Sequence, residues 1–164
     1  MKTKILNLLL TVFLLQGHAQ MNWKKYALAG STAFASGMID GTIESISFHY
    51  QNGFKSRFPK ANDQFWDPSI SWRNKYKNGD PSCGPNFPGS TTAFAFTSDA
   101  YHLLRTSKRA LDTYTLVYFI NEDRRIKCKK TKRRAALKDF AILTAIRCVG
   151  FQITYGYLFK PLKS

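Results

Sequence analysis

The sequence predicts an all-α fold: a small helical membrane bundle of three to four helices with one long aromatic and basic loop. Apolar stretches of helical length cover residues 27–50, 90–104 and 135–159, and a shorter apolar patch covers residues 111–120. Residues 51–88 are polar, aromatic and punctuated by Pro and Gly, which indicates a loop. At 164 residues the chain has room for a single domain.

The N-terminus has the build of a secretory signal peptide. Two lysines precede an apolar run over residues 5–15, and small residues at positions 17 and 19 fit cleavage after Ala19. We therefore expect residues 1–19 to be a signal peptide and residues 20–164 to form a single helical membrane-associated domain. An uncleaved membrane anchor is the alternative.

The charge of the chain points to an anionic partner. A formal net charge of +15 is large for a protein of this size and favours either nucleic acid or an anionic membrane surface. Because the signal-peptide pattern directs export, we expect the partners to be a lipid bilayer and its anionic headgroups, with no nucleic acid. The expected location is the bacterial cell envelope, in or tightly against the inner membrane, with the polar site facing the periplasm.

Residues 27–50 form the first expected helix, which carries ionisable side chains in an apolar context. Asp40 and Glu44 are four residues apart, so a helix places them on one face, and His49 follows. Beside them small residues recur at every fourth position, which lets another helix approach closely. These are Ala29, Ala33, Gly37 and Gly41. The carboxylates should therefore face a neighbouring helix; the alternative is an amphipathic helix at the membrane interface with its carboxylates in water.

Residues 51–88 combine aromatic rings with cations. The rings alternate with Arg73, Lys75 and Lys77. This arrangement suits a surface among lipid headgroups, with rings at the boundary and cations on phosphate. We expect Arg73 and Lys75 to bind substrate. The alternative is that the rings pack the loop onto the helices.

Residues 90–104 form the second expected helix, with Ser90 as its N-cap. Asp99 and His102 are three residues apart and share a face of this helix. Further along, residues 124–134 carry the densest charge of the chain. We expect them to form a cytoplasm-facing loop under the positive-inside rule, with nucleic-acid contact as the alternative.

Residues 135–159 are the best candidate for a membrane span. Asp139 and Arg147 interrupt this apolar run. An arginine that is buried alone is costly, so Arg147 should pair with a carboxylate or approach a phosphate. We therefore count Arg147 among the substrate-binding residues.

The cysteines give no disulfide framework and no metal motif. Cys83, Cys128 and Cys148 are odd in number and far apart along the chain. We expect three free thiols, with Cys148 in the core. A single disulfide from Cys83 to one of the other two is the alternative.

The first two helices together predict one buried polar site. Carboxylates and imidazoles spaced three and four residues apart are a recurring way to build a metal site in a helix bundle. The sequence predicts Asp40, Glu44, Asp99 and His102 as catalytic residues, and the same four with His49 as metal ligands. Such ligands suit Mg, Mn, Fe or Zn. The ion would activate water or polarise a phosphoryl oxygen of a lipid or phosphate headgroup.

The same charges also fit a protein without enzymatic activity. In this alternative the carboxylates pair with Arg147, Arg105 or His102 and only hold the helices together, so no cofactor is needed. The chain is then a structural or assembly protein of the membrane. Proton or ion conduction through the cluster is a third class.

Two runs of the chain, FWDPSISWRNKYKNGDP and GSTTAFAFTSDAYHLLRT, resemble small uncharacterised exported bacterial membrane proteins. The resemblance spans most of the mature chain and implies export and a membrane location, but no particular activity. A fainter likeness is to small envelope proteins that combine an Asp-x-x-His helix, a Glu-bearing helix and a Lys-Asp helix start. The matching residues are Asp99 and His102, Glu44, and Lys138 with Asp139, in a different order along the chain.

Overall fold

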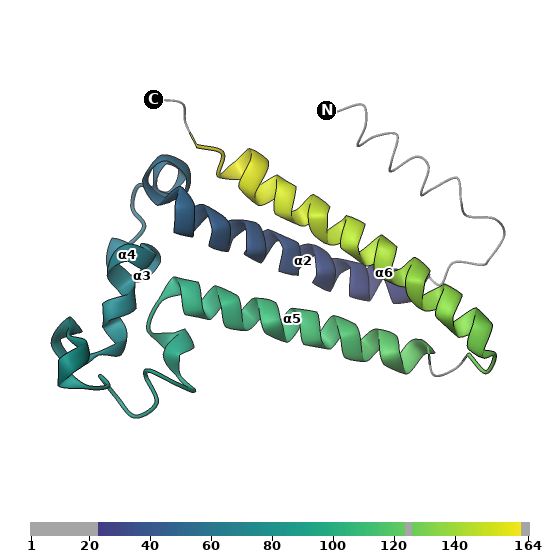
Figure 1. The fold of residues 1–164 in the computed structure, drawn as a ribbon. Coiled ribbons are helices and arrows are strands. Elements are labelled where there is room, and N and C mark those ends of the chain that lie inside the picture. Colours follow the sequence, from purple (N-terminus) through teal and green to yellow (C-terminus); the bar gives the residue numbers. More distant parts are fainter. Residues whose placement is uncertain (1–22, 124–125, 162–164) are drawn as a thin grey trace.

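Three long helices lie side by side and form the elongated body of the protein (Figure 1). In the computed structural model, which describes residues 23–123 and 126–161, they are α2 (Trp23–Phe48), α5 (Ala100–Asp123) and α6 (Lys129–Phe151). α2 packs against both of the others, whereas α5 and α6 barely touch each other. The described residues contain no β-strand, so the predicted all-α fold is confirmed. The predicted signal peptide lies outside the described residues.

α2 and α5 run antiparallel, and a row of polar contacts sets their register. The contact residues are four positions apart on α2 and three or four positions apart on α5, so on each helix they lie on one face and form a continuous polar seam. The pairs are Thr32 with Thr115 at 2.7 Å, Ser36 with Asp112, and Asp40 with Lys108 at 3.9 Å.

α2 and α6 approach so closely that glycine is required where they cross. A Cβ atom on Gly37 would lie 2.1 Å from the backbone oxygen of Arg147, and one on Gly150 would lie 2.3 Å from the backbone oxygen of Phe34. All four small residues of the predicted stripe on α2 are buried. The expected close approach of a second helix is therefore confirmed, and that helix is α6.

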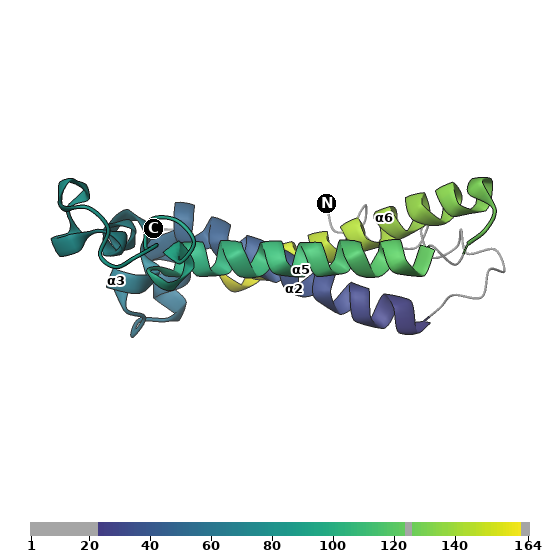
Figure 2. The same ribbon diagram turned by 90° about the horizontal axis from the view of Figure 1, so that it is seen from below.

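The segment predicted as a long loop is organised into short helical turns that gather at one end of the bundle (Figures 1 and 2). Several of these turns begin with a side-chain cap, in which Asn62, Asp67 or Asp80 accepts a backbone N–H two residues later. The turns are η1 (Tyr50–Lys55), α3 (Asp63–Trp66), α4 (Pro68–Ser71), η2 (Trp72–Lys75), η3 (Lys77–Gly79) and η4 (Pro81–Cys83).

An aromatic core attaches these turns to the long helices. Ile46, Tyr50, Phe54 and Phe159 are buried together, and Trp66 stacks on Phe54 with ring centroids 4.9 Å apart. Part of the aromatic loop therefore packs onto the helices, which was the alternative prediction for this segment.

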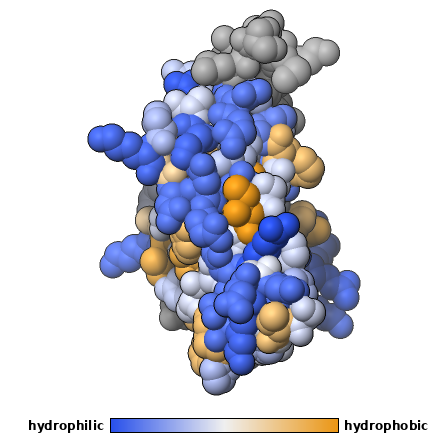
Figure 3. Space-filling view, turned by 90° about the vertical axis from the view of Figure 1, so that its left-hand side faces the viewer, coloured by the Kyte–Doolittle hydropathy of each residue, from blue (hydrophilic) through white to orange (hydrophobic). Residues whose placement is uncertain are grey.

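Seen from the loop end, the surface of the molecule is mostly hydrophilic (Figure 3).

Two predicted helix boundaries are wrong. Residues 90–99 form turns and the short η5 (Ala95–Thr97), because the Ser90 hydroxyl donates to the backbone carbonyl of Lys75 and caps no helix. α5 begins at Ala100 and runs without a break to residue 123, since no Gly or Pro interrupts it. α6 begins at Lys129, inside the predicted basic loop, because Lys and Arg are good helix formers.

The predicted span over residues 135–159 corresponds to most of α6 and the π-helix η6 (Gln152–Leu158) that continues it. Within the described residues no helix combines the length and the apolarity that crossing a membrane requires.

Candidate functional site

Asp99 and His102 meet at the start of α5. Asp99 is 1% exposed and its carboxylate accepts a hydrogen bond from the backbone N–H of His102 at 2.8 Å, which makes Asp99 the N-cap of the helix. The imidazole Nδ1 lies 2.8 Å from both carboxylate oxygens. A carboxylate in this position accepts the Nδ1–H of the ring, so in the neutral imidazole the remaining nitrogen, Nε2, is the acceptor.

Asp40 belongs to a second cluster, which lies between the three long helices. Arg147 of α6 donates to its carboxylate at 2.9 Å, and Lys108 of α5 bridges Asp40 and Asp112. Burial raises the pKa of Asp112, but hydrogen bonds from Ser36 and Lys108 and the charge of Arg147 outweigh burial and lower this pKa below its ordinary value. Two cations and two carboxylates make the cluster charge-balanced.

The structure does not bring Asp40 and Asp99 together. The α5 residue opposite Asp40 is Lys108, which lies nine residues, or about 13 Å of helix, beyond Asp99. Glu44 is half-buried and makes no hydrogen bond or ion pair with the described residues. Across residues 23–123 and 126–161, no three His, Cys, Asp or Glu side chains gather closely enough to hold a metal ion.

The remaining predicted site residues are also dispersed. His49 follows α2, and its Nε2 lies 3.1 Å from the hydroxyl of Tyr155 in η6. Arg73 and Lys75 lie on η2 at the loop end of the molecule, where the Arg73 guanidinium is 5.5 Å from the ring centroid of Trp72. Of the three predicted substrate-binding residues, these two are therefore on the loop and Arg147 is on α6, at the edge of the bundle.

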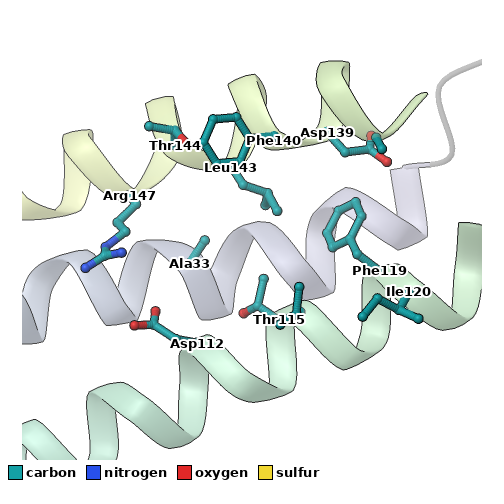
Figure 4. Close-up of a pocket in the computed structure, with 12 residues that line it drawn as sticks. Ala33, Asp112, Thr115, Phe119, Ile120, Asp139, Phe140, Leu143, Thr144 and Arg147 are labelled. Atoms are coloured by element: carbon teal, nitrogen blue, oxygen red, sulfur yellow. The ribbon is translucent and has the colours of Figure 1, made fainter. Parts of the chain in front are cut away.

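A groove that the sequence did not predict lies between α5 and α6, with α2 as its floor (Figure 4). Its volume is about 540 Å³. Leu116 and Ile120 line one wall, and Phe140 and Leu143 line the other. Arg147 and Asp112 point toward each other at one end of the view, and Asp139 lies at the other end. The spacing of Leu116 and Ile120 places them on one helix face, which the sequence shows. The sequence does not show that α5 and α6 lie apart, so the groove between them could not be predicted.

The fully exposed residues of the same two helices carry no charge over long stretches, and the charged side chains within these stretches are partly or fully buried. Every exposed residue of α6 and η6 between positions 136 and 158 is uncharged, and so is every exposed residue of α5 between positions 110 and 121. We call these two stretches the uncharged face. Leu116, Ile120 and Phe140 are exposed and also line the groove, so the two halves of the face meet there.

Exposed cations lie at the end of the uncharged face where α6 begins. The basic cluster, as we use the term, consists of Lys127, Lys129, Lys130, Lys132, Arg133 and Arg134. All six are exposed. The helices therefore pass directly from a strongly basic surface to an uncharged one.

Comparison with protein-family models, curated proteins and solved structures finds no match to this chain.

Proposed function

We propose that this chain is a small protein of the bacterial envelope that attaches to the inner membrane through its uncharged face and acts there as a non-enzymatic structural or assembly protein. The uncharged face carries the proposal. A surface helix in water normally presents charged residues on its outer side. Here the fully exposed residues of α6 and η6 carry none over about 33 Å of helix, where the charged Lys138 and Arg147 are half-buried. The exposed residues include Phe140 at 71% and Tyr157 at 82% exposed. Exposed apolar patches of this kind mark protein or membrane contacts.

The basic cluster supports anionic lipid as the partner. Each Lys or Arg near an anionic membrane surface contributes about 1 kcal/mol of attraction. Because the cluster lies at one end of the uncharged face, aliphatic and aromatic side chains can enter the lipid while the cations reach headgroup phosphates. The signal-peptide pattern of residues 1–19 supports a location in the envelope.

The contacts of the charges between the helices favour a structural role for them. The half-buried Asp40 pairs with Arg147, and the buried Asp139 of α6 pairs with Lys25 and Tyr26 of α2. Each pair joins α2 to α6, and a partner of this kind is what the buried Asp139 requires. These carboxylates hold the helices in register.

A divalent metal site is the second candidate function, and the Asp99–His102 pair supports it. A buried carboxylate on Nδ1 is the arrangement that orients a histidine for a metal ion or a proton at Nε2. In this proposal Mg, Mn, Fe or Zn binds there and acts on a lipid or phosphate headgroup. Titration of purified protein with Zn²⁺ tests it: His102→Asn should abolish a stoichiometric site, and unchanged binding would reject it.

Vesicle flotation tests membrane attachment. The mature protein should float with vesicles of phosphatidylglycerol and remain unbound with vesicles of phosphatidylcholine at moderate salt. Phe140→Asp combined with Val149→Asp should abolish flotation, because both substitutions put charge in the uncharged face. Phe87→Asp combined with Phe94→Asp is the matched control, since it adds the same charge at exposed rings that lie outside this face. Equal flotation of the face variant and the control would reject the proposal.

The native cysteines allow a footprint of the same contact. Cys148 lies exposed on the uncharged face, contrary to its predicted place in the core, whereas Cys83 lies exposed among the loop turns. Vesicles should protect Cys148 from a membrane-impermeant maleimide and leave Cys83 reactive. Equal protection of both thiols would contradict attachment through this face.

A further inference from the structure

A second cavity lies at the loop end of the bundle, in a part of the molecule that neither proposed function uses. Its volume is about 700 Å³, within the range of small-molecule sites. Four aromatic residues line it, Phe54, Phe58, Trp66 and Phe159. We call it the aromatic pocket.

The rings of the aromatic pocket hold one another in place. Phe54 lies 4.9 Å from Trp66 and 5.3 Å from Phe159, measured between ring centroids, and Phe58 lies 5.2 Å from Phe54. Phe54 and Phe159 are each 4% exposed, so the base of the pocket belongs to the protein core. A wall built this way is formed before a ligand arrives, which lowers the cost of binding.

Two uncompensated cations line the same pocket. Arg57 and Lys60 are exposed, and neither makes a hydrogen bond or ion pair with the described residues. The nearby Lys55 differs, because it binds the Asp63 carboxylate and the Ala61 carbonyl. Among the described residues no carboxylate lines the pocket, so its electrostatic character is positive.

We propose that the aromatic pocket binds one amphiphile that has an acyl chain and a single anionic headgroup. The acyl chain of the ligand lies among the four rings, and its carboxylate or phosphate lies against Arg57 and Lys60. Charge complementarity selects the anion, because two cations without partners gain the most from an ionised oxygen ligand. The apolar rings favour the acyl chain, because contact with them removes its apolar surface from water.

Trp66 provides a direct probe of the pocket. The chain has three tryptophans, so Trp23→Phe with Trp72→Phe leaves Trp66 as the sole emitter. A fatty acid brominated along its chain should quench Trp66 saturably below its micelle concentration. Arg57→Gln with Lys60→Gln should weaken this binding about tenfold or more, whereas Lys75→Gln with Lys77→Gln, which removes the same charge elsewhere, should not.

Two further ligands distinguish the features of the amphiphile. The brominated methyl ester lacks the anion and should bind at least about tenfold more weakly than the acid. A brominated lysophosphatidylglycerol tests whether the ligand is a free fatty acid or a lysophospholipid. The one of these two probes that binds more tightly identifies the class of ligand. Absence of saturable quenching by any anionic ligand, or equal affinity in the pocket variant and its control, would overturn the proposal. The assay needs no vesicles and leaves the uncharged face intact, so its result is independent of the flotation test.

Discussion

Arg147 of α6 donates a hydrogen bond to Asp40 of α2 at 2.9 Å and thereby joins positions 107 residues apart in the chain. The two side chains are 38% and 32% exposed, so the pair lies at the edge of the bundle and not in its centre. Lys108 approaches the same carboxylate from α5. One carboxylate therefore connects all three long helices.

Replacing Asp40 by Asn should lower the free energy of unfolding by about 1 kcal/mol, a modest value because solvent screens a pair that is one-third exposed. Urea denaturation followed by circular dichroism measures the change. Glu44→Gln is the control, because Glu44 has no such partner in the described residues, and it should change stability by less than about 0.5 kcal/mol. In a double-mutant cycle with Arg147→Gln, full additivity would contradict the pairing.

Replacing Gly37 by Ala should destabilise the protein by about 1–3 kcal/mol, because the new Cβ would lie 2.1 Å from backbone atoms of α6. This occurs although alanine favours a helix over glycine by about 1 kcal/mol. Gly30→Ala is the matched control on the same helix. Its Cβ would meet only the end of the flexible Ile146 side chain at 3.3 Å. Thermal unfolding should show a lower midpoint for Gly37→Ala alone, and similar midpoints would contradict the close helix contact.

Replacing Asp99 by Ala should lower stability by about 1–2 kcal/mol, the usual cost of losing an N-cap. Asp99→Asn should cost less, since the amide oxygen still accepts the N–H of His102. Amide hydrogen exchange in the first turn of α5 localises the effect. Equal losses for the two variants would argue that the cap is unimportant and that charge alone matters at this position.

The stability contributed by Asp112 should disappear in acid. Because hydrogen bonds from Ser36 and Lys108 and the charge of Arg147 lower its folded-state pKa, this contribution is fully present above the ordinary Asp pKa of about 3.9. It is lost as pH falls through the lower pKa of the folded state. Asp112→Asn should therefore destabilise the protein at neutral pH, and this destabilisation should shrink as pH falls below the ordinary Asp pKa. A loss of equal size at neutral and at acid pH would show that the carboxylate charge contributes nothing.

Cys128 should be the most reactive of the three thiols at neutral pH. The backbone and hydroxyl of Thr131 and the backbone of Lys130 donate hydrogen bonds that lower the pKa of Cys128 below its ordinary value, so more thiolate is present. Reaction of single-cysteine variants with Ellman's reagent measures the rates. Thr131→Val should slow the reaction of Cys128 with the reagent. A faster reaction at the exposed Cys83 than at Cys128 would contradict the prediction.

Local patterns correctly predicted several parts of the structure. The all-α class and the close approach of a helix to the stripe that contains Gly37 follow from spacings of three or four residues. The shared helix face predicted for Asp99 and His102 is replaced by a contact at the helix start, where Asp99 precedes the first residue of α5. The partner of Asp40 required more information, because helical spacing shows which residues share a face but not which face meets which neighbour. The predicted helix start at Ser90 was wrong for a related reason. The Ser90 hydroxyl donates to the carbonyl of Lys75, which is 15 residues away in the sequence, and so it does not cap a helix.

The sequence by itself determined that the chain is helical, strongly basic and supplied with ionisable side chains on apolar helices, because periodicity and composition are local properties. Only the tertiary structure decided that Asp40 lies beside Arg147 while Asp99 lies about 13 Å further along α5. The antiparallel register of α2 and α5 sets that separation, and register depends on contacts between distant residues. The groove and the aromatic pocket also exist only because helices far apart in sequence pack at particular distances.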